Sequence, residues 1–307
     1  CFRFLANQNN GNGGVILTGG IERFDGASLA FTLTYTLGGT NTDNNTIQGA
    51  IIQGTPSGPL AISKIDAGKW VFTNSANTYS GATSVSAGTL AVSGSTSGTY
   101  LGAAAGGAVT ITSGAVIELS GGVSVNKASA AMTLGGTGIG TNGANRSTSG
   151  VNTYTASGYT LSAATTVKVD ADSLTLASAG AMTGAFAFTK DGAGELILPQ
   201  TASTYTGITT VSAGSLTVAK LANVSANSSI GAPTTAGNGT ISMGANTTIK
   251  HNGTTADSTD RIISLSAAGS LTIDSSGTGS GAVTLASGGS FTLPNGADTL
   301  IFTGTNS

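Results

Sequence analysis

Apolar residues in this chain recur in short pairs at positions i and i+2. Val109 with Ile111 and Leu174 with Leu176 show the pattern, and clusters of Gly, Ser, Ala and Asn separate one pair from the next. A period of two is typical of β-strands that bury one face, and the small residues between them supply sharp bends. Helical periodicity is nearly absent. The sequence therefore predicts an all-β protein of many short strands.

A longer pattern occurs twice. Residues 77–92 read NTYSGATSVSAGTLAV and residues 203–218 read STYTGITTVSAGSLTV, at an offset of 126 (203 minus 77). The similarity extends without a gap over 62–92 and 188–218. Repetition at a fixed offset predicts a repeat architecture, in which one unit can bury its apolar face only against its neighbours.

A shorter offset occurs near the C-terminus, where the segment 263–273 resembles the segment 283–293. This spacing predicts coils of about 20 residues, each with two or three short strands, which stack by parallel pairing about 4.8 Å apart. At that period the chain makes about a dozen coils. We therefore expect a parallel β-helix, or β-solenoid.

Within the two long repeats, the alternation assigns residues to the interior or to corners. The interior positions, which should point into one continuous apolar core, are Val85, Leu90, Val92, Val211, Leu216 and Val218. Gly88 and Gly214 should lie at corners, where a positive φ or a close backbone approach is needed. Tyr79 and Tyr205 could bind sugar as exposed rings or pack over a corner, and packing is the favoured interpretation.

The segment 1–60 follows a different pattern. Its apolar residues alternate strictly from position 29 to position 37, a run longer than a coil strand: Leu29, Phe31, Leu33, Tyr35 and Leu37. We expect a distinct N-terminal β segment over 1–60 and a β-solenoid over 61–307. The N-terminal segment is either a cap over the end of the solenoid, which is favoured, or an assembly element whose long strand pairs with another subunit.

Charge is scarce, at 8% of residues and a net charge of −2, compared with about 25% in ordinary domains. Without a dense basic patch, nucleic acid is not an expected partner. A weakly charged surface repels other copies of the chain little, so such copies are expected partners. No apolar stretch reaches the length of a transmembrane helix. The single cysteine, Cys1, excludes an intrachain disulfide; lipidation after signal removal and a processed chain start are the alternatives for it.

Catalytic patterns are sparse. His251, the only histidine, is expected in a solvated loop, and one histidine with one cysteine does not support a zinc site. Three pairs of acids could serve a solenoid glycosidase or lyase, and they are Asp170 with Asp172 on one strand face, Asp191 with Glu195, and Asp257 with Asp260. Thirteen acids spread over the coils produce such pairs by chance. We expect no enzyme activity, no catalytic or metal-binding residues and no cofactor.

Segments 77–94 and 193–220 resemble the autotransporter passenger-associated β-strand repeat. Both contain its core, Tyr-x-Gly followed by Thr-x-Val-x-Ala-Gly-x-Leu-x-Val. The resemblance is specific over about 66–120 and 188–250, weaker elsewhere in the solenoid, and absent over 1–60. It implies a right-handed β-helix exported to the surface of bacteria, commonly in large adhesive or structural proteins. It brings no catalytic residues.

Three functions remain as hypotheses. The leading one is a non-enzymatic extracellular structural protein whose copies associate into a filament, sheath or layer at the bacterial cell surface. The second is an adhesin passenger that binds host cells or glycans, which would make cell-surface glycans a partner. The third is a carbohydrate-active enzyme built on a solenoid.

Overall fold

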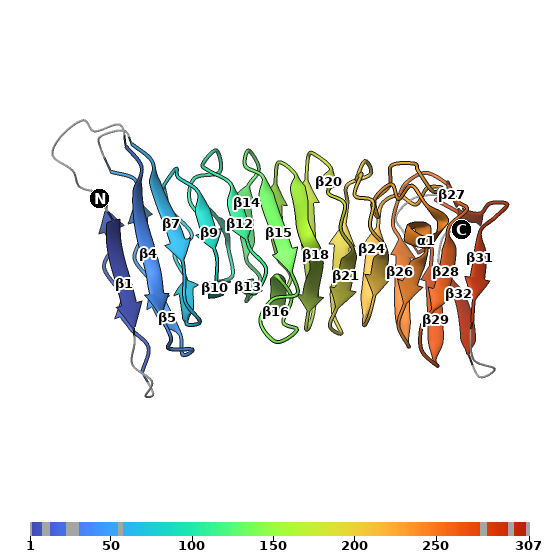
Figure 1. Cartoon of the computed structure of the whole chain (residues 1–307), viewed down its shortest axis with the longest axis horizontal. Coiled ribbons are helices and arrows are strands. Elements are labelled where there is room, and N and C mark those ends of the chain that lie inside the picture. Colours follow the sequence, from blue (N-terminus) through green and yellow to red (C-terminus); the bar gives the residue numbers. More distant parts are fainter. Residues whose placement is uncertain are drawn as a thin grey trace.

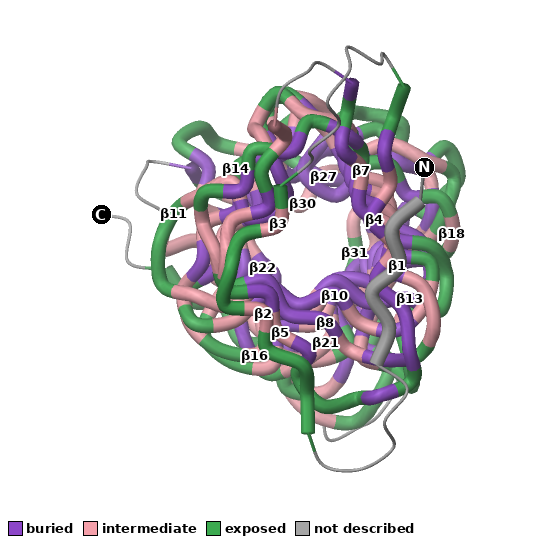
Figure 2. Tube along the Cα trace, turned by 90° about the vertical axis from the view of Figure 1, so that its left-hand side faces the viewer, coloured by how far each residue is buried: buried purple, intermediate pink, exposed green. Residues whose placement is uncertain are grey.

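The computed structural model is an elongated rod of β-strands, with β1 at one end and β32 at the other (Figure 1). It describes residues 2–7 (backbone only), 13–22, 31–54, 58–276, 281–293 and 298–304. Parallel strands stack in about ten coils. Viewed from the N-terminal end, the chain winds clockwise as it recedes (Figures 1 and 2), so the solenoid is right-handed.

The strands stack in three columns, which we number in chain order. The first column is β1 (Phe2–Asn7), β4 (Leu33–Gly39), β7 (Leu60–Lys64), β9 (Thr83–Val85), β12 (Val109–Ile111), β15 (Met132–Gly136), β18 (Tyr159–Val169) and β20 (Met182–Thr183). The second is β2 (Ile16–Leu17), β5 (Asn45–Ile47), β8 (Lys69–Phe72), β10 (Gly88–Ser93), β13 (Ala115–Ser120), β16 (Asn145–Ser149), β18, β21 (Phe188–Asp191), β23 (Thr209–Val211), β25 (Ile241–Met243), β28 (Ile262–Leu265) and β31 (Ser290–Thr292).

The third column is β11 (Ser97–Gly98), β14 (Ser124–Lys127), β17 (Asn152–Ala156), β19 (Ser173–Ser178), β22 (Glu195–Leu198), β24 (Ser215–Val218), β26 (Thr247–His251), β29 (Ser270–Asp274) and β32 (Thr299–Thr303). Two separate pairs are β3 (Ile21–Glu22) with β6 (Ile51–Ile52) and β27 (Asp257–Thr259) with β30 (Val283–Leu285). A single helical turn, α1 (Ala236–Gly239), interrupts the longest coil. Strand β18 belongs to two columns, because residues 159–161 pair with β15 and β20 and residues 165–169 pair with β16 and β21.

Alternate side chains of the stacked strands enter one apolar core, and buried positions line the inside of the coil in Figure 2. The interior positions of the long repeats are all fully buried, namely Val85, Leu90, Val92, Val211, Leu216 and Val218. Gly88 and Gly214 lie at corners with φ of 67°. A Cβ at Gly88 would lie 2.3 Å from the Asp66 carbonyl oxygen, and a Cβ at Gly214 would lie 2.5 Å from the Gly192 carbonyl oxygen. Both positions therefore require glycine.

One coil takes more residues than the short offset near the C-terminus predicted. Ile62 stacks on Thr83, an offset of 21 (83 minus 62), and Thr209 stacks on Ile241, an offset of 32 (241 minus 209). The 20-residue offset relates β28 to β30, but these strands do not stack on each other, because β28 pairs with β31 and β30 pairs with β27. The predicted length of about 20 residues holds for the coils within the long repeats and fails for longer coils such as the one from Thr209 to Ile241.

The two long repeats occupy different columns. In the copy at 62–92, β7 and β9 lie in the first column and β8 and β10 in the second. In the copy at 188–218, β21 and β23 lie in the second column and β22 and β24 in the third. The second copy begins five coils and one corner after the first, because β20 is five coils beyond β7 in the first column and β21 follows β20 in the second. Any column can accept this unit because all three use parallel pairing with alternate residues inward.

Parallel stacking continues across residue 60. Strand β4 lies between β1 and β7, and β5 lies between β2 and β8. Leu33, Tyr35 and Leu37 are buried, Phe31 is 38% exposed, and Leu29 lies outside the described residues. Because both edges of β4 are occupied, pairing with another subunit through this strand would require displacement of a neighbour. A capping or assembly role for 1–60 remains a prediction.

Candidate binding face

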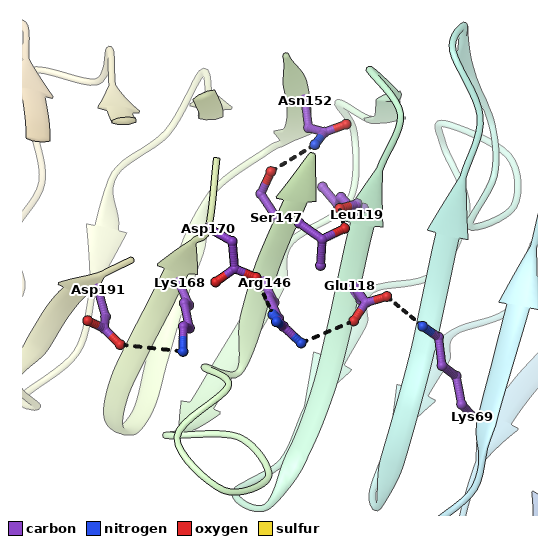
Figure 3. Close-up of polar contacts among 10 residues, drawn as sticks. Lys69, Glu118, Leu119, Arg146, Ser147, Asn152, Lys168, Asp170 and Asp191 are labelled. Carbon is purple, nitrogen blue, oxygen red and sulfur yellow. Dashed lines mark hydrogen bonds and ion pairs between the residues drawn. The ribbon is translucent and has the colours of Figure 1, made fainter. Parts of the chain in front are cut away.

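Six charged side chains form a line of ion pairs on the outer surface of the second column (Figure 3). We call this set the charged ladder, and its members are Lys69, Glu118, Arg146, Lys168, Asp170 and Asp191. The ladder contains a quarter of the 24 charged residues of the protein (11 basic and 13 acidic). The other 18 charged residues (24 minus 6) lie elsewhere in the chain, so the ladder is a continuous lateral group of ion pairs on a weakly charged protein.

Parallel register explains the first part of the ladder. Glu118 and Arg146 are direct partners on β13 and β16, so their side chains project from neighbouring strands in the same direction. Lys69 Nζ donates to Glu118 Oε1 at 2.7 Å. Arg146 Nη1 lies 3.7 Å from Glu118 Oε2, and its Nε donates to Asp170 Oδ2 at 2.7 Å. Each cation thus faces a carboxylate.

Lys168 and Asp191 continue the ladder on β18 and β21. Lys168 Nζ lies 4.0 Å from Asp191 Oδ2, which is the longest contact of the set. The ladder side chains are 12–31% exposed, and ion pairs near the surface contribute only about 0.2–1 kcal/mol each. The ladder therefore positions charge more than it stabilises the fold.

A surface hollow of about 380 Å³ lies beside the Asp191 end of the ladder. Its walls come from the loop at 137–143, which joins β15 to β16, and from β18, β21 and the residue after β23. The lining residues are Thr137, Thr141, Thr166, Thr189, Asp191 and Ser212. Five hydroxyls and one carboxylate therefore line one space, and Asp191 belongs to both the hollow and the ladder.

The loop at 137–143 is closed by its own backbone. Gly143 N donates to the Thr137 carbonyl oxygen at 2.8 Å. Thr141 has a φ of 73°, in the left-handed region, which costs a residue with a Cβ about 1–2 kcal/mol. Gly143 packs against β18, where an added Cβ would lie 3.0 Å from the Thr166 carbonyl oxygen. The strained turn is thus fixed against the strand that forms part of the hollow.

A buried lysine caps the same corner in both long repeats. In the second copy, Lys190 Nζ donates to the carbonyl oxygens of Asp191, Gly192 and Ala213 at 3.0, 2.7 and 3.0 Å. The corresponding lysine of the first copy makes three equivalent bonds. Burial lowers the pKa of three lysines, which we call the buried lysines, from 10.5 to about 8: Lys64, Lys127 and Lys190. These groups hold the fold and are closed to a ligand.

Tyr79 and Tyr205 are fully buried. Their hydroxyls form 2.8 Å hydrogen bonds with the hydroxyls of Thr83 and Thr209, and burial raises the pKa of both phenols well above the ordinary value. A sugar cannot stack on either ring, because neither is exposed. Both rings pack in the core, as the favoured interpretation expected.

His251 is only 2% exposed, so the expectation of a solvated loop histidine was wrong. Its Nε2 lies 2.8 Å from Asp257 Oδ2, and its Nδ1 lies 3.2 Å from the Gly281 carbonyl oxygen. Sequence reasoning missed this pair because Asp257 returns to His251 across a corner. Both ring nitrogens face oxygen atoms, so neither remains to take a proton from a nucleophile.

The acids considered for catalysis have other partners. Asp170 pairs with Arg146, and Asp172 Oδ2 accepts from Gly150 N at 2.7 Å. Both follow the end of β18, so the expectation that they share a strand face was wrong. Over the described ranges, no group of three or more His, Cys, Asp and Glu side chains could hold a metal ion. No helix in those ranges is long and apolar enough to cross a membrane.

Comparison with known proteins identifies the repeat. The family model described as passenger-associated-transport-repeat matches residues 62–92 and 188–218. An adhesin, the BmaC autotransporter of Brucella suis biovar 1 (strain 1330), is 31% identical over 308 residues. The match covers 98% of this chain but 8% of that adhesin, so the chain spans less than a tenth of the relative's length. No solved structure matches. The repeat and the relative indicate a surface-exposed or extracellular location.

Proposed function

We propose that this chain, which contains two matches to the passenger-associated-transport-repeat model, is a non-enzymatic rod that adheres to other surfaces through its side. The observation that carries the proposal is the continuity of the charged ladder with the hollow. Together they gather charge and hydroxyl groups on one lateral surface of a weakly charged rod. Stacked repeats commonly bind through such extended lateral surfaces.

Two further observations support adhesion without catalysis. The relative that aligns with nearly the whole chain is an adhesin. Within the described residues, the one histidine has both ring nitrogens engaged, and the acids at 170 and 172 have separate partners. The rod then serves to hold the binding face away from the cell, and its dry core makes it stiff.

Bead adhesion tests the proposal. Beads coated with the full chain should adhere to cultured epithelial cells at least tenfold more than uncoated beads. The double variant Glu118→Gln with Arg146→Gln removes one ladder pair, and adhesion should fall. The matched control, Lys250→Gln with Asp274→Asn, removes two opposite charges that are register partners on the third column, and adhesion should persist. Wild-type beads that adhere no better than uncoated ones would refute the proposal.

A self-associating scaffold is the second candidate. The observation that favours it is the low charge of the chain, 8% of residues, because weakly charged rods repel each other little. A subunit of a filament, sheath or layer should form larger species as its concentration rises. Analytical ultracentrifugation and negative-stain microscopy of the purified chain check this, and a monomer at all concentrations contradicts it.

A further inference from the structure

The hollow beside the charged ladder is lined by small side chains that carry both a polar group and apolar carbon, and apolar atoms make up most of its exposed lining. Five of its six lining residues carry hydroxyls, and the sixth is Asp191. A hydroxyl both donates and accepts hydrogen bonds, whereas a carboxylate only accepts. A ligand that matches this lining carries groups that both donate and accept, together with apolar C–H surface, and a sugar ring meets both conditions. Asp191 is paired with Lys168, so the hollow offers no unpaired charge to an ionic ligand.

The hydroxyls of the hollow are available to a ligand. Among the described residues, no side-chain hydrogen bond engages the hydroxyl of Thr166, Thr189 or Ser212, nor those of the two loop threonines. Other outward hydroxyls on the rod do find partners, such as Thr160 with Thr183. The hollow thus presents a cluster of unengaged hydroxyls, where hydrogen bonding to a ligand would replace only water.

The spacing of the hydroxyls sets the direction of the ligand. Thr166 on β18 and Thr189 on β21 are register partners, so they are about 4.8 Å apart along the rod. Ser212 follows β23, the next strand of the same column. A ligand in contact with all three therefore crosses three successive coils and runs mainly along the solenoid axis, with a sideways step to Ser212, which follows the register partner of Lys190.

The loop at 137–143 fixes the remaining wall in advance. Thr141 retains a left-handed backbone, although a glycine there would be unstrained. Strained residues of this kind are often found at functional sites, and the side chain of Thr141 lines the hollow. A wall that is already formed lowers the entropy lost when a ligand binds. The volume of about 380 Å³ lies within the range of small-ligand sites, roughly 300–1,000 Å³.

We propose that the hollow lined by Thr137, Thr141, Thr166, Thr189, Asp191 and Ser212 is a binding subsite for a neutral saccharide that lies along the rod axis. This inference rests on the proposed adhesive function and names the class of ligand. The threonine and serine hydroxyls bind the sugar hydroxyls, and the Asp191 carboxylate accepts from one of them. The loop at 137–143 covers one side of the sugar.

Binding of the full chain to an array of defined neutral, sialylated and sulfated oligosaccharides tests the proposal. The wild type should bind neutral members. The double variant Thr166→Val with Thr189→Val keeps the side-chain shape and removes two hydroxyls, so affinity should fall at least tenfold. The matched control is Thr110→Val with Thr133→Val, which are also half-buried register partners, on β12 and β15. Its affinity should stay within twofold of the wild type.

A loop variant separates binding from folding. Thr141→Gly removes a hydroxyl and relieves the backbone, so affinity should fall at least threefold while the melting temperature does not fall. A fall in melting temperature together with unchanged affinity would show that Thr141 acts only in folding and would overturn its role in the hollow. Asp191→Asn keeps an acceptor, so it should weaken binding less than the loss of both threonines.

The remaining outcomes distinguish this inference from the adhesive function. Saccharide binding that survives loss of the Thr166 and Thr189 hydroxyls overturns the hollow as the subsite. Binding restricted to sialylated or sulfated members overturns the neutral class. If no saccharide binds while coated beads still adhere to cells, the subsite is refuted and the adhesive function stands. If neither binding nor adhesion occurs, both proposals fail.

Discussion

Replacing Lys190 by methionine should destabilise the coils of the second long repeat. Its ammonium group donates to the carbonyl oxygens of Asp191, Gly192 and Ala213, where two coils meet at a corner. Methionine fills a similar length but donates nothing, so three partly buried acceptors lose their donor. A buried carbonyl without a partner is costly, because water cannot replace the lost bond.

Two effects of opposite sign set the magnitude. Hydrogen bonds from a charged donor contribute about 1.5–3 kcal/mol each, and the burial that lowers the pKa of Lys190 to about 8 offsets part of the gain from the three bonds. At pH 7, one unit below that pKa, the ammonium form exceeds the neutral amine about tenfold. The variant therefore loses charged donors, and the net loss of stability should be about 2–4 kcal/mol.

Urea denaturation at pH 7, followed by circular dichroism, measures this loss. The equivalent substitution Lys64→Met should cost a similar amount, and the double variant should be additive because five coils separate the two sites. Lys250→Met, on the outer side of β26, is the matched control and should change little. Hydrogen exchange should locate the loosening at 188–218. A Lys190→Met protein as stable as the wild type, or more stable, would refute the reasoning, since relief of the buried charge would then outweigh three hydrogen bonds.

Three further outcomes are expected. Gly214→Ala should lower the melting temperature, with a loss above about 1 kcal/mol, because φ is 67° and the new Cβ would come within 2.5 Å of a carbonyl oxygen; an unchanged melting curve would contradict the corner geometry. Tyr205→Phe removes the hydrogen bond to Thr209 and should cost about 1 kcal/mol in thermal unfolding, while bead adhesion stays unchanged; a loss of adhesion without a loss of stability would reopen a binding role. Urea midpoints should rise from pH 8 to about pH 9.5, because the pKa of each buried lysine is lowered from 10.5 to about 8 and the unfolded chain binds more protons in that window. Above about pH 10 the midpoint should fall again, because burial raises the pKa of the buried tyrosines. The Lys190→Met variant should show a smaller rise between pH 8 and about pH 9.5. A wild-type midpoint that falls over this window would contradict the reasoning.

Local features of the sequence were sufficient for the fold class. The alternation at Leu90 and Val92 reports which side of a strand is buried, and this depends only on neighbouring residues. Gly88 and Gly214 mark corners for a similarly local reason, because backbone sterics restrict a positive φ largely to glycine. The coil length could not be predicted from local features, since it depends on the lengths of all the loops between two successive strands of one column.

The candidate binding face depended on the tertiary structure. Glu118, Arg146 and Asp191 are far apart in the chain, and only the register of β13, β16, β18 and β21 brings them into one line. The hollow likewise joins a loop at 137–143 to Ser212. The pairing of His251 with Asp257 depends on the path of a corner. No local pattern encodes such contacts.

The sequence by itself determined that this chain winds into a β-solenoid with a dry core, because alternation and corner glycines act within a few residues. Only the tertiary structure decided which surfaces the coils bring together. The two long repeats show the difference, because nearly the same residues lie on different columns at 62–92 and 188–218. Register between coils is a sum over all the corners between them, so a repeat that begins five coils and one corner later lies on another side of the rod.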